Sequence, residues 1–128
     1  MEDKRGLRAL KVSSAIKRLL VVIVVAVAAL AIYSELDYFR TEDLQLAAAR
    51  NDVRGIRRLA ALGVNINGID ESGDSALFAA VYNGNYEAAE VLVSLGARAK
   101  LRSERGTPFE IARDDKMRRI LKKAVDWR

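Results

Sequence analysis

The chain carries two different patterns of apolar residues. One uninterrupted run, LLVVIVVAVAALAIY, extends from Leu19 to Tyr33, and no charged residue occurs from Leu19 through Ser34. Beyond residue 40, apolar residues instead recur at helical spacing, with glycine and asparagine between the segments. The first pattern predicts a helix that is apolar on every side, and the second predicts several short helices that each bury one face.

The clearest pair of short helices is predicted between Gly73 and Ala99. Glycine and asparagine tolerate positive φ, so the sequence Asn83-Gly84-Asn85 is expected to end the first helix. The second helix is expected from Tyr86 to Leu95, with Gly96 at its C-terminal end. The apolar faces consist of Leu77, Ala80 and Val81 in the first helix and of Ala88, Ala89, Leu92 and Val93 in the second.

This pattern repeats at a spacing of 33 residues without an insertion. The corresponding pairs are Leu44 with Leu77, Ala47 with Ala80, Leu59 with Leu92, Leu62 with Leu95, and Gly63 with Gly96. A third, shortened copy begins at Gly106 with the sequence GTPFEIA. Such spacing is typical of repeat architectures, in which units too small to bury their own apolar faces stack on their neighbours.

The repeated unit resembles the ankyrin repeat, whose usual pattern is G-x-T-P-L-H-x-A-A, a glycine turn, a second helix and then L-L-x-x-G-A-D-V-N. The resemblance covers Thr41 to about Lys123. Matching positions are Gly73, Leu77, Ala80, Gly84, Leu92, Gly96 and Ala97, the segment from Gly63 to Asn67, and Thr107-Pro108 in the third copy. The second copy departs from the pattern at Ser75-Ala76 and at Phe78, where the family usually has histidine, and at Arg98 and Lys100. The resemblance implies helix-turn-helix units separated by projecting finger turns.

The apolar run from Leu19 to Ser34 predicts a membrane span. Its 16 residues would rise ~24 Å as a helix, slightly less than a hydrocarbon core of roughly 30 Å. Lys17 and Arg18 can reach the headgroups at one end, and Tyr33 and Tyr38 would lie near the far interface. A core helix of a soluble domain would need surrounding elements, which the repeats do not offer.

Flanking charge predicts the orientation of this span. Six basic residues precede it (Lys4, Arg5, Arg8, Lys11, Lys17 and Arg18), whereas acidic residues dominate immediately after it. The positive-inside rule therefore places the N-terminus in the cytoplasm, and the repeats on the periplasmic or extracellular side of an inner or plasma membrane. Alternatively, Ala29-Leu30-Ala31 is similar to a signal-peptide cleavage site, and cleavage would yield a soluble periplasmic protein. A nucleic-acid-binding tail is the other interpretation of the basic N-terminus.

We therefore expect an all-α fold: a short ankyrin-repeat solenoid of about three helix-turn-helix units with finger turns, preceded by one N-terminal transmembrane helix. The expected segments are a basic cytoplasmic tail (1–18), a transmembrane signal-anchor helix (19–34), an acidic linker (35–40) and an ankyrin repeat domain (41–128) with units at 41–69, 70–102 and 103–128. Thr41 is the expected N-cap of the first repeat helix. Trp127 is expected to pack on the last helix pair.

Composition argues against catalysis. The chain has no cysteine and no histidine, so it lacks thiol nucleophiles, disulfides and the commonest general base and zinc ligand. Four carboxylates could act as acid–base groups, namely Glu104, Glu110, Asp114 and Asp115. No nucleophile–base pair, glycine-rich phosphate loop or metal-ligand spacing accompanies them in the sequence. We predict no catalytic residue, cofactor, metal or small-molecule substrate.

The resemblance implies that the chain binds a protein through its finger tips and the outward residues of its first helices. The candidate residues are Asp70, Glu71, Ser72 and Asp74 in the first finger, Arg102, Glu104 and Arg105 in the second, and Phe78, Tyr82 and Asn83 on the middle helix, flanked by Gln45, Ala49, Glu110 and Arg113. Aromatic side chains give a large contact area at low rotamer cost. For Phe78, packing between helices is the alternative to partner contact.

The repeats change charge along their length. Acidic residues exceed basic ones from Thr41 to Ala97, and the balance reverses from Arg98 onward. The basic end is either a solvated cap or a surface that steers an acidic protein or an anionic membrane. Nucleic acid is not expected, because no aromatic residues interleave with the basic ones. The expected role is an adaptor, an accessory factor or an inhibitor or immunity-type protein. A self-associating structural membrane protein is the alternative, although the apolar run has no glycine and hence no GxxxG motif.

Overall fold

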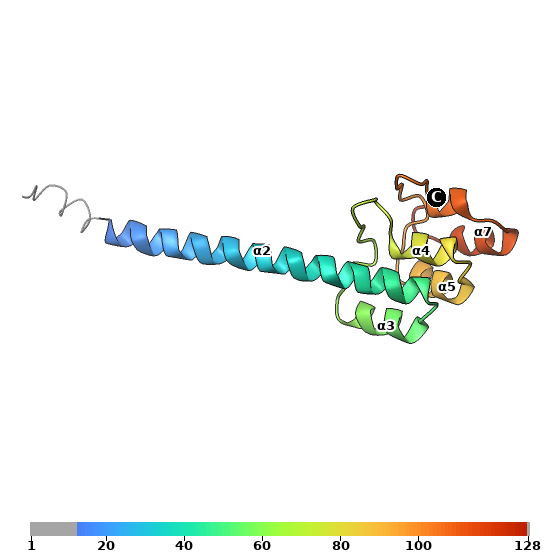
Figure 1. Cartoon of the computed structure of the whole chain (residues 1–128), viewed down its shortest axis with the longest axis horizontal. Coiled ribbons are helices and arrows are strands. Elements are labelled where there is room, and N and C mark those ends of the chain that lie inside the picture. The colour runs from blue at the N-terminus through green and yellow to red at the C-terminus, as the bar shows by residue number, and fades with distance from the viewer. Residues whose placement is uncertain (1–12, 128) are drawn as a thin grey trace, which may run out of the picture. The chain divides into compact units, whose positions relative to one another are not determined.

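The structure is a computed structural model that describes the backbone of residues 13–127 and their side chains except those of residues 37–39. The chain divides into two compact units, Met1–Glu35 and Leu36–Arg128. The boundary falls within helix α2 (Ser14–Ala49) (Figure 1). The basic tail proposed for residues 1–18 lies largely outside the described residues, as does the side chain of Tyr38.

The described part of the first unit is the N-terminal portion of α2. The side chains of residues 14–35 are exposed, including the whole apolar run. Among residues 13–127, α2 is the one helix that is long and apolar enough to cross a membrane by length and composition. An N-terminal signal sequence has the same properties, so the membrane anchor and the cleaved signal peptide both stay predictions.

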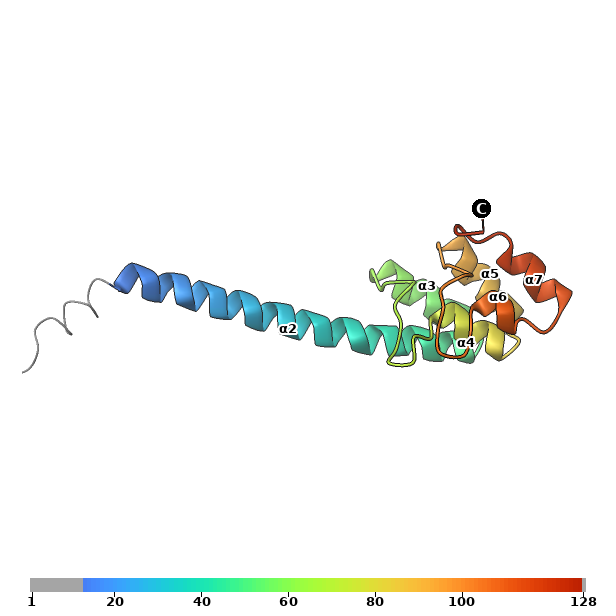
Figure 2. The same ribbon diagram turned by 90° about the horizontal axis from the view of Figure 1, so that it is seen from above.

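The second unit is a stack of short helices in two layers. After α2 come α3 (Val53–Ala61), α4 (Ala76–Tyr82), α5 (Tyr86–Ser94), α6 (Pro108–Ile111) and α7 (Asp115–Leu121). Helix α5 packs against both α3 and α7, while α4 packs against α5 and α6 (Figure 2). Residues 36–127 contain no extended strand, only isolated bridges between Ile69 and Ser75 and between Ser103 and Gly106. The prediction of an all-α helical repeat is confirmed.

Local side-chain caps explain where four of these helices begin. The Asp52 carboxylate accepts a hydrogen bond from the Gly55 amide (2.9 Å), and the Ser75 hydroxyl accepts one from the Phe78 amide (3.2 Å). Asp114 caps α7 in the same manner. Thr107 and Glu110 form a reciprocal capping box around Pro108 at the start of α6. Each cap satisfies an amide that has no partner within its own helix.

Apolar side chains from all the repeats form one core. The largest fully buried ones in this core are Leu44, Ile56, Leu77, Leu92, Met117 and Leu121, one or two from each long helix of the stack. The small residues Ala48, Ala80, Ala88 and Ala89 are also fully buried, which lets neighbouring helices approach closely. Trp127 contacts Phe109 with the ring centroids 4.3 Å apart, so the prediction that it packs on the last unit is confirmed.

Asparagine side chains join one repeat to the next through the backbone. The Asn85 side-chain amide donates to the carbonyls of Ala48 (2.9 Å) and Ala49 (2.8 Å), which are at the C-terminal end of α2. Asn67 makes an equivalent bridge between the finger turns, because its side chain donates to the Gly96 carbonyl and accepts from the Arg98 amide. These bonds satisfy polar backbone groups that the helices leave open and fix how the repeats align.

Two turns that project from the helices lie against each other. The first finger turn (residues 62–75) connects α3 to α4, and the second (residues 95–107) connects α5 to α6. The Glu104 amide donates to the Ser72 carbonyl (3.1 Å). Gly73 has φ +78°, and a Cβ added there would lie 3.2 Å from the Cα of Ser103. Glycine is therefore required at residue 73 for both its conformation and its contact.

The expected linker and helix start are wrong. Residues 35–40 are helical, and Thr41 lies inside α2 rather than at its N-cap. The physical reason is that residues 34–41 contain no glycine or proline to end the helix. Thr41 is buried instead against Gly68, where an added Cβ would lie 2.6 Å from the Thr41 hydroxyl oxygen. Its role is packing below the first finger turn.

We predict that Asn85→Ala lowers the free energy of unfolding of the stack by about 1–2 kcal/mol, because the Ala49 carbonyl loses the Asn85 hydrogen bond and the Ala48 carbonyl keeps only the bond from the Asn51 amide. Urea unfolding of the full chain in a nonionic detergent, followed by the fluorescence of the single tryptophan, Trp127, measures this change. Asn83→Ala is the matched control, since the Asn83 side chain bonds to Ala79 of the helix that it caps, and we expect a change within about 0.5 kcal/mol. Equal effects of the two substitutions would contradict the proposed role of Asn85.

We predict that the Tyr86–Asp114 hydrogen bond makes stability depend on pH. The Tyr86 hydroxyl donates to Asp114 Oδ2 at 2.6 Å. This bond is the largest cause of both pKa shifts: the pKa of Asp114 is lowered and the pKa of Tyr86 is raised. Because the pKa of Asp114 is lower in the folded protein than in the unfolded chain, the ionised carboxylate stabilises the fold above the unfolded pKa. This stabilisation is lost as the pH falls through the pKa that Asp114 has in the folded protein. Because the pKa of Tyr86 is higher in the folded protein than in the unfolded chain, the protonated hydroxyl stabilises the fold below the unfolded tyrosine pKa, about 10. This stabilisation is lost as the pH rises through the pKa that Tyr86 has in the folded protein.

The stability difference between the wild type and Tyr86→Phe should therefore be largest from about pH 5 to 9 and should shrink outside that range. Urea midpoints of both proteins, measured within this range and on its acidic and alkaline sides, give the difference. A gap that does not change with pH would show that the hydroxyl acts without its carboxylate partner.

Candidate functional site

A hollow of about 530 Å³ opens on one side of the second unit. It lies between residues 42–49 of α2, helix α4 and the two finger turns. Its lining residues are Glu42, Gln45, Leu46, Ala49, Asp70, Asp74, Phe78, Ala79, Tyr82, Asn83 and Arg105. Its volume is within the range of about 300–1,000 Å³ that is typical of ligand sites.

Two aromatic side chains of α4 lie beneath an arginine of the second finger turn. The guanidinium of Arg105 lies 4.8 Å from the ring centroid of Phe78 and 5.1 Å from that of Tyr82. The two rings are nearly parallel, with their centroids 6.4 Å apart. Phe78 is only 1% exposed, whereas Tyr82 is 51% exposed. Tyr82 is thus the aromatic surface that the hollow offers, and Phe78 supports it from below.

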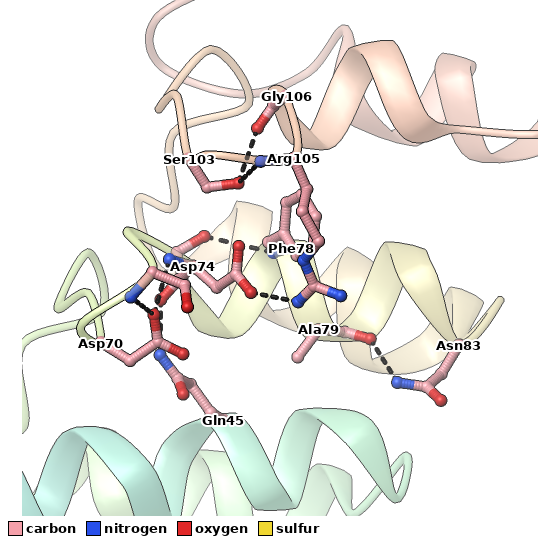
Figure 3. A network of polar contacts seen from close by, with 11 residues as sticks. Gln45, Asp70, Asp74, Phe78, Ala79, Asn83, Ser103, Arg105 and Gly106 are labelled. Atoms are coloured by element: carbon pink, nitrogen blue, oxygen red, sulfur yellow. Dashed lines mark hydrogen bonds and ion pairs between the residues drawn. The ribbon is translucent and has the colours of Figure 1, made fainter.

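Arg105 also forms an ion pair with Asp74, as Figure 3 shows. The Arg105 guanidinium donates to Oδ2 of Asp74, a residue that is only 5% exposed. The hydrogen bond to Asp74 is the main reason that the pKa of Arg105 is raised. A carboxylate this deeply buried needs a partner, because removing its charge from water is costly. The second oxygen, Oδ1, is buried and has no hydrogen-bond partner among the described residues.

The first finger turn is held at the rim of the hollow by a short hydrogen-bond network (Figure 3). The Asp70 Oδ1 accepts from the amides of Ser72 and Asp74, both at 2.9 Å. The Gln45 side chain on α2 donates to the Asp74 carbonyl at 2.5 Å. Asp70 lines the same hollow as Asp74 and Tyr82.

The hollow contains eight of the fourteen binding residues predicted from the sequence, namely Gln45, Ala49, Asp70, Asp74, Phe78, Tyr82, Asn83 and Arg105. Glu71, Ser72 and Glu104 are exposed on the finger turns outside its lining. Arg102 is also outside and pairs with Glu110 at 2.7 Å. The guanidinium of Arg113 lies 5.9 Å from the ring centroid of Tyr82 and lines a separate hollow of about 120 Å³.

One of these predictions needs correction, and one open alternative is decided. For Phe78 the sequence left partner contact and packing between helices open, and its exposure of only 1% beneath Arg105 favours packing. Asp74 was expected at a finger tip, but it is buried beside the N-terminus of α4 and paired with Arg105. Both side chains shape the hollow from within, and neither offers an exposed contact area.

Sequence reasoning missed three residues of the lining, Glu42, Leu46 and Ala79. Leu46 is 48% exposed although it is a large apolar residue. Helical spacing could have shown this, since Leu44, Ala47 and Ala48 share a face and Leu46 does not. Leu62 is likewise exposed at the end of α3, because the chain turns away there.

The fold and the hollow define a helical repeat protein with a mixed aromatic and polar surface at α4. Residues 44–93 match the family model of ankyrin repeats (many copies). The structure is similar to that of the human ASB11 ankyrin repeat domain (27% identity, TM-score 0.57), covering 61% of this chain and 37% of that one. It is also similar to the ankyrin repeat domain of Bcl-3, described as a unique member of the IkappaB protein family (31% identity, TM-score 0.59), covering 62% of this chain and 35% of that one.

These matches support the ankyrin repeat family, and the second unit has the ankyrin-repeat fold. The chain spans little more than a third of the length of either solved domain. A search of curated proteins gave no significant match. Ankyrin repeats are protein–protein interaction modules and are generally non-catalytic.

We predict that Phe78→Ala lowers the free energy of unfolding by about 3–5 kcal/mol, because it empties a fully buried site. Tyr82→Ala, one helical turn away, should cost less than about 1 kcal/mol, since half of the side chain is already exposed. Urea unfolding of the full chain in nonionic detergent measures both values. A small effect of Phe78→Ala would show that its ring is not part of the folded core.

Proposed function

We propose that this chain is a non-catalytic binding module in which ankyrin repeats, tethered to a membrane, bind a protein through the hollow at α4. The observation that carries the proposal is the exposed ring of Tyr82, supported by buried Phe78 and flanked by Arg105. Interfaces draw most of their binding energy from a few aromatic and arginine side chains in well-packed surroundings. Tyr82 and Arg105 have these properties before any partner is present.

The side chains of the hollow are held in place before any partner binds, and this favours binding. Arg105 is held by Asp74 and two aromatic rings, and Asp70 by two amides of its own turn. Side chains that are already ordered lose little entropy on association, so less of the contact energy is offset. Rigid-body docking of a partner segment onto this hollow is therefore a reasonable expectation.

The proposed tether is the apolar run from Leu19 to Ser34, with the repeats on the periplasmic or extracellular side. Its exposed apolar side chains and its basic N-terminal flank support this assignment. Cleavage after Ala31 would instead leave a soluble periplasmic ankyrin protein. In either form the repeats would act as an adaptor, an accessory factor or an inhibitor or immunity-type protein.

We predict that a photo-crosslinking amino acid at Tyr82 captures one dominant protein in cells, because this position is at the centre of the proposed contact surface. The control is the same amino acid at Glu90, which is exposed on α5 and does not line the hollow. Mass spectrometry identifies the adduct, and the intact mass of the free protein shows whether residues up to Ala31 are retained.

Capture from residue 82 but not from residue 90 would support binding through the hollow. Capture of a second copy of this chain would favour the self-associating alternative. Equal adducts from both positions, or none at residue 82 in a folded protein, would contradict the proposed surface.

A further inference from the structure

We propose that the hollow receives a lysine or arginine side chain from a basic segment of the partner, with the cationic group at Asp70 and Asp74. This inference rests on the proposed function and adds the chemical class of the bound group. It is carried by three features of the lining, namely its charge, one buried oxygen without a partner, and an apolar wall beside the acids.

The charge of the lining is the first feature. Three acidic side chains line the hollow (Glu42, Asp70 and Asp74) against one basic side chain, Arg105. Arg105 is already paired with Asp74, so it is not available to a second anion without breaking that pair. The remaining two carboxylates, Glu42 and Asp70, leave a net negative surface that favours a cation and disfavours an acidic partner.

The buried oxygen of Asp74 is the second feature. Its Oδ1 has no hydrogen-bond partner among residues 13–127, although the residue is only 5% exposed. A buried acceptor without a donor costs free energy, and such groups are rare in folded proteins. An ammonium or guanidinium group would supply this donor once the side chains around Asp74 shift to admit it, since both carry several N–H groups and no acceptor.

The third feature is the apolar surface next to the acids. Leu46, Ala79 and Tyr82 line the same hollow as Asp70 and Asp74. Lysine and arginine have long aliphatic stems that pack on apolar surface while the charged end stays with polar groups. The exposed ring of Tyr82 extends this apolar surface. A basic side chain therefore matches both parts of the lining.

Synthetic peptides test this inference with the full chain in zwitterionic detergent micelles, which carry no net charge to attract the peptide. The probe is a glycine–serine octapeptide with two lysines, its ends blocked. The matched peptide replaces both lysines by norleucine, which keeps most of the stem and removes the charge, and a third peptide has glutamates instead. Chemical shift changes of backbone amides give the site and the affinity of each peptide.

We expect the lysine peptide to shift the amides around residues 70–83 and to bind at least tenfold more tightly than the norleucine peptide. Raising the ionic strength from about 50 to about 300 mM should weaken it, since exposed charges are then screened. Asp70→Asn and Glu42→Gln should each weaken binding about threefold, as expected for the loss of a partly exposed charge pair. Asn at residue 70 can still accept the two amide hydrogen bonds of the turn, so the fold is retained.

Glu90→Gln is the matched control, because it removes one exposed acidic charge from outside the hollow and should leave the affinity unchanged. Equal weakening by Glu90→Gln and Asp70→Asn would show only non-specific attraction and would overturn the inference. Equal binding of the norleucine peptide at residues 70–83 would overturn it as well, while leaving the hollow as a protein-binding surface. Absence of binding by the lysine peptide would also overturn it, and the crosslinking result at Tyr82 would decide the proposed function separately.

Discussion

The second unit depends on the stacking of helices that are too short to be stable alone. The longest helices between residues 50 and 127 have nine residues, below the roughly 12–15 at which isolated helices become marginally stable in water. Their apolar faces are buried only because each repeat covers the next. Asn85 and Asn67 add hydrogen bonds across the repeats to backbone groups that helix ends leave open. Burial thus supplies the main stabilisation of the stack, and these asparagines fix its alignment.

Most of the stack could be predicted from sequence because its determinants are local. Glycine turns and helical spacing located the end of α4 and both ends of α5 to within about one residue. The start of the first repeat was predicted wrongly for a reason that is not local. Thr41 has the character of an N-cap, but the preceding residues favour helix and its side chain packs against Gly68, far along the chain.

The candidate site was less predictable because its central contacts join residues distant in sequence. The pair of Arg105 and Asp74 spans 31 residues and two finger turns, and no local pattern reports it. The same contact explains the burial of Phe78, since the Arg105 guanidinium covers the ring. Tyr82 was predictable, because it lies on the outer side of a helix whose apolar face was already assigned to the core.

The shortened third repeat does more than cap the end of the stack. Its finger turn supplies Arg105, which covers Phe78 of the second repeat and balances the buried charge of Asp74. Without that turn the second repeat would expose a large aromatic ring and leave a buried carboxylate unpaired, and both changes are costly. The hollow therefore needs all three repeats, because α2 provides one wall, α4 the centre and the second finger turn the cationic edge. The stability of the stack and the shape of the binding surface consequently both depend on Arg105. A substitution of this arginine that alters the binding surface therefore also alters the stability of the stack.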